Sequence, residues 1–139
     1  MRLRATLLVL PVPIDRLALV SCLTSAPTHM KTVRLEAALR TLKKMSEEID
    51  YQTCFEEKNF TAGLIAFRPG KKRDSKQINH ADKDVLCHVL RGNGRLRVNN
   101  RRIPLRPGMI CHIPKGTPHD FAAGERTRLV LFYSLIHTG

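Results

Sequence analysis

The sequence predicts an all-β domain, a small barrel or sandwich, in its C-terminal two thirds. Apolar, strand-like segments recur at intervals of roughly ten residues after residue 50, which is typical of such folds. All eight glycines lie at or after Gly63, and glycine or proline separates most of these segments. The 139 residues are enough for one domain with room for a tail.

Residues 1–29 are expected to be an unstructured extension, or translated sequence that precedes a native start at Met30. An apolar stretch near the beginning resembles a signal peptide, and the residues before Cys22 resemble a lipoprotein processing site. Asp15 and Arg16 argue against both, because burying them in a bilayer would cost several kcal/mol. No run of 18 apolar residues exists, so we expect no membrane-spanning helix.

Residues 30–47 are predicted to form an amphipathic helix, at about residues 32–45, and a linker. Apolar side chains recur there at helical spacing: Leu35, Ala38, Leu39, Leu42 and Met45. Lys43 and Lys44 lie near the end of the expected helix, where positive charge is favourable.

Residues 48–139 are assigned to the β-domain, with strands between about residues 50 and 136. The expected strands are residues 51–55, 60–67, 85–90, 95–98, 103–105, 109–113 and 129–136. Turns rich in glycine, proline or asparagine separate several of them, of which Asn99-Asn100 is typical of a tight hairpin.

The second half of this domain carries a recognisable motif. Gly108, Pro114, Gly116 and His119 have the spacing Gly-x5-Pro-x-Gly-x2-His, which resembles the second motif of the cupins. The motif ends in Asn in that family, and Ala123 takes this position here. The resemblance implies that His119 follows a Pro-Gly turn and points into a barrel.

Residues 85–94 resemble the end of the first cupin motif, a strand followed by Val-Leu-x-Gly-x-Gly. The resemblance covers about residues 60–136. It implies a cupin-type jelly-roll barrel preceded by a short N-terminal helix.

The resemblance also implies a metal site, although the first motif departs from the family pattern His-x-His, three or four residues, Glu, six residues, Gly. Anchoring on Gly92 puts Val85 at the Glu position and keeps one ligand at most. Anchoring on His80 makes Asp84 the carboxylate, with one extra residue that a bulge would absorb. The implied set of His80, Asp84 and His119 suits Fe(II), Mn(II), Ni(II) or Zn(II).

The same residues allow a barrel without metal. His80 and Asp84 lie in a polar stretch and could be exposed loop residues, and His119 could contact a ligand or fill the barrel. His88 lies in an apolar strand, which is typical of a core or interface histidine. It also has the strand parity of Asp84 and is therefore a candidate for the same cavity.

The four cysteines are expected to be free, reduced thiols in a cytoplasmic protein: Cys22, Cys54, Cys87 and Cys111. They form no Cys-x-x-Cys pair, and three of them lie in or beside strand-like segments. Cys87 and Cys111 are further candidates for the ligand pocket.

The formal net charge of +12 favours anionic partners without specifying one. Basic residues gather at residues 71–76 and around the Asn99-Asn100 hairpin, as either a solvated face or an anion-binding patch. The sequence has no tryptophan, two tyrosines and no helix-turn-helix or zinc-finger motif, so nucleic-acid binding is not expected.

Three classes of function remain: a barrel binding a metal and a small ligand, a metal-free ligand-binding or sensor cupin, and an accessory protein using its basic surface. We expect the first, with catalysis unproven. We also expect a homodimer, because residues 129–136 are apolar on both faces of one strand. The helix at residues 32–45 could instead cover that face within one chain.

Overall fold

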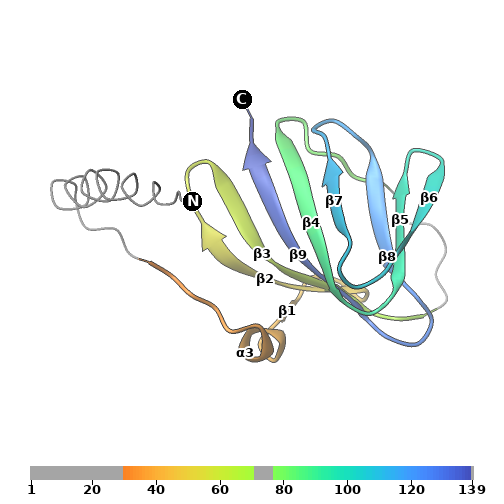
Figure 1. Cartoon of the computed structure of the whole chain (residues 1–139), viewed down its shortest axis with the longest axis horizontal. Helices are drawn as coiled ribbons and strands as arrows, with labels where there is room; N and C mark the ends of the chain where they lie inside the picture. The colour runs from red at the N-terminus through yellow and green to blue at the C-terminus, as the bar shows by residue number, and fades with distance from the viewer. Residues whose placement is uncertain (1–29, 71–76, 139) are drawn as a thin grey trace, which may run out of the picture. The chain divides into compact units, whose positions relative to one another are not determined.

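The computed structural model describes residues 30–70 and 77–138 (Figure 1). All strands of the described residues belong to one compact unit, residues 33–139. The expectations for residues 1–29, for Cys22 and for the basic segment 71–76 lie outside the described residues. Within them, no helix has the length and hydrophobicity needed to cross a bilayer.

Antiparallel strands in two sheets make up most of the described residues, which confirms the all-β prediction. One sheet has six strands in the order β1-β2-β3-β9-β4-β7, and the other has three in the order β6-β5-β8. The strands are β1 (Lys43–Lys44), β2 (Ile49–Glu56), β3 (Phe60–Phe67), β4 (Lys83–Arg91), β5 (Gly94–Val98), β6 (Arg101–Leu105), β7 (Ile110–Ile113), β8 (His119–Ala123) and β9 (Leu129–His137).

The N-terminal helix α3 spans only Leu35–Leu39, so the prediction of a helix over residues 32–45 is wrong in its length. Lys43 and Lys44 form strand β1 instead, opposite Tyr51 and Asp50 of β2. Pairing with a sheet that is already present outweighs the helical spacing of the local sequence, because intrinsic propensity is a weak preference.

Helix α3 packs on the outer face of the six-stranded sheet. Its buried Ala38 and Leu39 contact Leu64, Ala66 and Val130 of β3 and β9. This contact supports the alternative in which the helix covers the apolar face of residues 129–136 within one chain. Dimerisation itself stays a prediction, which light scattering would test.

Strand β9 lies between β3 and β4 in the six-stranded sheet (Figure 1). Its Leu129 and Leu131 are fully buried in the core between the two sheets, and Val130 is buried beneath α3. Burial on both faces explains the uninterrupted apolar sequence of this strand.

Candidate functional site

A cavity of about 370 Å³ lies inside the domain and is lined by side chains of both sheets. Most of its wall is apolar and comes from Ile49, Ile65, Phe67, Val85, Phe121, Leu131 and Leu135. The polar side chains in the wall include His80, His119, Tyr51 and Tyr133. An apolar cavity of this size with a few convergent polar groups is typical of a small-molecule site.

His119 is the first residue of β8 and is 3% exposed. Its backbone exchanges two hydrogen bonds with Ile78, at 2.8 and 2.9 Å. Its Nδ1 lies 2.8 Å from the carbonyl oxygen of Thr117, which can only accept a hydrogen bond. Nδ1 therefore carries a proton, and Nε2 is the ring nitrogen left to contact a ligand.

His80 lies beside His119 in the cavity wall, with 6.0 Å between the ring centroids. Its carbonyl oxygen accepts a hydrogen bond of 2.7 Å from the backbone N–H of Gly116, which ties it to the turn before His119. Burial, followed by the nearby His119 and Lys83, lowers the pKa of His80. This imidazole is therefore neutral at pH 7 and can accept or donate a hydrogen bond.

Asp84 does not join the two histidines. Val85, Cys87 and Val89 of β4 are buried toward the core, so alternation turns Asp84 and His88 to the opposite, outer face. Among residues 30–70 and 77–138 no group of three His, Cys, Asp or Glu side chains is arranged to hold a metal ion. The implied set of His80, Asp84 and His119 is therefore not formed. Asp84 and His88 do share a face, but that face is not the cavity wall.

Asp84 instead anchors the turn that leads to His119. Its carboxylate accepts hydrogen bonds from the backbone N–H of Lys115, at 2.9 Å, and from Nε2 of His112, at 3.2 Å. These bonds, first the one from Lys115, lower the pKa of Asp84 below its ordinary value near 3.8. The turn that carries the motif is thus tied to β4 through this side chain, and to the segment before β4 through the His80 carbonyl.

We expect the Asp84→Asn variant to melt a few degrees below the wild type at pH 7. A carboxylate with a lowered pKa stabilises the fold above its ordinary pKa, and this contribution is lost as the pH falls through the lowered value. The difference between the two proteins should therefore shrink below about pH 4 and vanish at still lower pH. Melting temperatures measured from pH 7 to pH 2 check this, and a difference as large at the lowest pH as at pH 7 would contradict it.

Cys87 and Cys111 are directly opposite each other on β4 and β7, and both thiols are free. Cys87 is 2% exposed and lines the cavity. Cys111 packs against the same core but is not among the residues that line the cavity. Burial, and secondarily the neighbouring Cys111, raises the pKa of the Cys87 thiol to about 12.

Cys87 should therefore be among the least reactive thiols of the native protein. The thiolate is the reactive form of a cysteine. With a pKa near 12, the thiolate fraction of Cys87 at pH 8 is at least about a hundred times smaller than that of an ordinary cysteine, and alkylation should be slower by roughly that factor. Mass spectrometry of peptides after timed iodoacetamide treatment measures the rate. Labelling of Cys87 as fast as in the denatured chain would show that it is not packed as described.

Tyr51 and Tyr133 are cavity residues that the sequence did not identify. Tyr133 hydrogen-bonds the side chain of Thr53, and burial is the main cause that raises its pKa. Strand alternation did place Tyr133 on one face with Leu131 and Leu135, but it could not tell which face of β9 turns inward.

Part of the basic hairpin is neutralised within the structure. Asp120 is 7% exposed, and its two carboxylate oxygens accept hydrogen bonds of 3.1 and 3.2 Å from Arg97. Arg95 lies 3.8 Å from the same carboxylate. This pairing favours a structural role for these two arginines over an anion-binding patch.

Comparison with known families and structures agrees with this description. The family model described as a cupin domain matches residues 63–134. No curated protein sequence matches the chain significantly.

Solved structures with similar folds belong to diverse proteins. The cupin domain of Cnp3 from Schizosaccharomyces pombe is 15% identical, with a TM-score of 0.67 over 77% of this chain and 74% of the other. A predicted oxalate decarboxylase from Thermotoga maritima is 18% identical, with a TM-score of 0.65 over 77% and 99%. The polyketide cyclase RemF from Streptomyces resistomycificus is also 18% identical, with a TM-score of 0.64 over 78% and 80%. At these identities the likeness concerns the jelly-roll fold alone.

Proposed function

The chain belongs to the cupin family, and on that premise we propose that its barrel cavity binds a small organic ligand without a metal ion. The ligand is mainly apolar and carries a hydroxyl group, of a phenol or an enol, that contacts His80 and His119. The observation that carries this proposal is that the buried His119 and the partly buried His80 lie side by side in a cavity whose wall is largely apolar. Ligand pockets are commonly built in this way, with a few polar groups that fix orientation.

A hydroxyl group matches the hydrogen-bonding capacity of the two rings. The Thr117 carbonyl engages the Nδ1 proton of His119, which leaves Nε2 to form a hydrogen bond with a ligand hydroxyl. His80 is neutral at pH 7 because burial lowers its pKa. A ligand O–H can donate to one ring nitrogen, and its oxygen can accept a bond from the other ring.

The described residues do not fit a divalent metal ion. Zinc sites in proteins use three or four protein ligands. Cys87, Asp120 and Glu48 also line the cavity, but among the described residues no three His, Cys, Asp or Glu side chains come together as a metal site. Val85, at the Glu position when the first motif is anchored on Gly92, is 5% exposed and lines the cavity. An apolar side chain therefore occupies part of the wall where that alignment requires a carboxylate.

The ligand class is tested with 1-naphthol and naphthalene, which differ by one hydroxyl group. We expect 1-naphthol to bind about fivefold more tightly, since one net hydrogen bond contributes about 1 kcal/mol. His119→Phe should still bind naphthalene but lose the preference, whereas His88→Phe, a change on the exposed outer face, should keep it. Titration calorimetry measures the affinities. Equal affinities in the wild type, or no binding of either compound, would overturn the proposal.

The metal-free part is tested by elemental analysis of untagged protein purified without added metal. We expect iron, manganese, nickel and zinc well below one ion per chain, and no rise in melting temperature when each is added. A stoichiometric metal that disappears in His119→Phe would instead support the metal-binding alternative.

A further inference from the structure

One border of the cavity is formed by residues 45–49, here named the entrance turn. It comprises the turn between β1 and β2 and the first residue of β2. Met45, Glu48 and Ile49 of this turn line the cavity. Met45 is 56% exposed, and Ile78, which also lines the cavity, is 55% exposed. Exposed apolar side chains at the edge of a cavity mark the place where an apolar ligand would first make contact.

The entrance turn has few attachments to the sheet through its own strand. Strand β1 consists of two residues and lies at the edge of the six-stranded sheet, where it pairs with β2. Within the turn, the backbone N–H groups of Met45 and Ser46 donate to the Ile49 carbonyl, at 2.8 and 3.1 Å. The Ser46 hydroxyl oxygen accepts from the N–H groups of Glu48 and Ile49. These bonds shape the turn and join it to Ile49, the first residue of β2, which pairs with Phe67 of β3.

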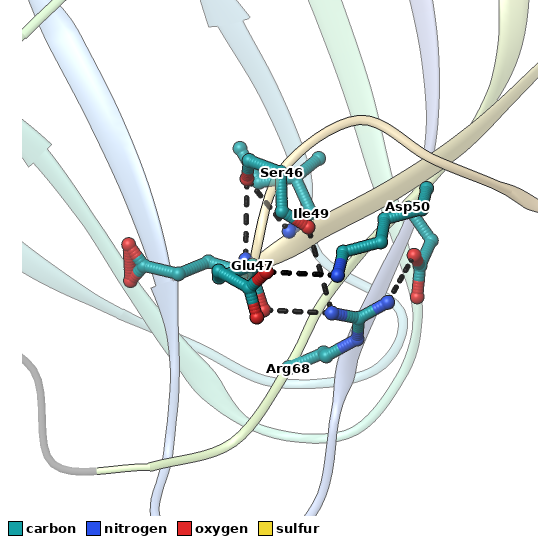
Figure 2. Close-up of polar contacts among 7 residues, drawn as sticks. Ser46, Glu47, Ile49, Asp50 and Arg68 are labelled. Carbon is teal, nitrogen blue, oxygen red and sulfur yellow. Dashed lines mark hydrogen bonds and ion pairs between the residues drawn. The ribbon is translucent and has the colours of Figure 1, made fainter.

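Arg68, directly after β3, adds a second attachment, made to the residues between β1 and β2 (Figure 2). Its backbone N–H donates to the Glu48 carbonyl at 2.8 Å. Its guanidinium donates to the carbonyl oxygens of Glu47, at 2.7 Å, and Ser46, at 3.5 Å. The other end of the guanidinium pairs with the Asp50 carboxylate at 2.6 Å, and the Asp50 side chain is only 15% exposed.

A planar guanidinium suits this position, because its fixed N–H groups can reach several acceptors at once. A lysine at position 68 would keep the charge but offer a single ammonium group on a flexible stem. A lysine would therefore hold the three acceptors on the entrance turn and β2 less firmly than the guanidinium does.

We propose that Arg68 is a positioning residue that clamps the entrance turn over the cavity, and that ligands enter and leave as this turn opens. The inference rests on the proposed ligand-binding function, but its first test does not need a ligand. Cys87 lies inside the same cavity and reports how often a small reagent reaches the interior.

The first test measures iodoacetamide modification of Cys87 in the folded full chain by peptide mass spectrometry. We expect Arg68→Lys to accelerate it about tenfold, as local opening becomes more frequent. Arg91→Lys is the matched control, because Arg91 forms an exposed ion pair with Glu36 of α3 and does not line the cavity. Cys54, beneath α3 on the other face of the sheet, should react at an unchanged rate in both variants.

Equal acceleration by Arg68→Lys and Arg91→Lys would overturn the clamp. If Arg68→Lys unfolds the protein, Cys54 will also be modified faster, and Asp50→Asn is then used in place of Arg68→Lys. We expect Asp50→Asn to accelerate Cys87 modification about threefold, because the bond from Arg68 to the Glu47 carbonyl remains. No acceleration by Asp50→Asn would equally overturn the proposal.

The second test measures 1-naphthol association and dissociation by stopped-flow fluorescence. We expect both rate constants to rise about tenfold in Arg68→Lys, with the affinity changed less than about threefold, because a gate alters rates more than equilibrium. Unchanged rates despite faster Cys87 modification would show that ligands use another route and would overturn the proposal. Absence of 1-naphthol binding in every variant, with faster Cys87 modification, would reject the proposed ligand class and leave the clamp supported.

Discussion

Replacement of Gly92 by alanine is expected to lower the free energy of unfolding by about 2–5 kcal/mol, through backbone strain and overpacking together. Gly92 has a φ of +79°, in the left-handed region that residues with a side chain rarely adopt. A Cβ added there would lie 2.0 Å from the carbonyl oxygen of Arg128, just before β9. Backbone cannot move aside as a flexible side chain can, so the β4–β5 turn or the start of β9 has to shift.

Gly116→Ala is the matched control for this prediction. Gly116 has the same φ of +79°, but a Cβ there would meet no atom within 4 Å. Its substitution should therefore cost only the strain of about 1–2 kcal/mol. Chemical denaturation of both variants separates the two effects. Equal losses would show that close approach to Arg128 contributes nothing.

Leu129→Ala is expected to cost about 2–5 kcal/mol, because it leaves a cavity in a packed core. Leu129 is fully buried at the start of β9, and one of its methyl groups lies close to Gly94. For a domain of this size the loss corresponds to a fall in melting temperature of about 10 °C or more. Calorimetric melting of the purified variant measures it.

Ile110→Ala provides the comparison, since Ile110 is 73% exposed on the outer face of β7. It should change the melting temperature by no more than about 2 °C. A comparable loss from both substitutions would show that the outer face of β7 is covered in solution. That result would support the predicted homodimer.

The sequence predicted most strands because turn residues and apolar segments are local signals, but β1 and β8 were not among the expected strands. Gly92, Gly108 and Asn99 all have positive φ angles at turns between strands. The uninterrupted apolar run of β9 also indicated burial on both faces, which its central place in the sheet explains. The helix was predicted too long because Lys43 and Lys44 pair with β2, and pairing with a distant strand leaves no mark in the local sequence.

The site was harder to predict for a geometric reason. Alternation along β4 places Asp84 with His88 and Val85 with Cys87, and this grouping is correct. Alternation does not say which of the two sets of side chains faces inward. Leu86, in the set with Asp84 and His88, is also apolar, so either set could pack in a core. Only the pairing of β4 with β7 and β9 decides the question. His119 could be placed because its motif includes the turn that directs it inward.

The central position of β9 has a consequence for biosynthesis. Strands β3 and β4 both pair with it, although they leave the ribosome long before residues 129–137 are made. At about 5–20 residues per second, the roughly sixty residues between the end of β3 and the start of β9 take several seconds to translate. During this time both strands present open edges that invite pairing with other nascent chains. A chaperone that protects this polypeptide therefore has to hold β3 until β9 emerges, and crowded polysomes are where aggregation would begin.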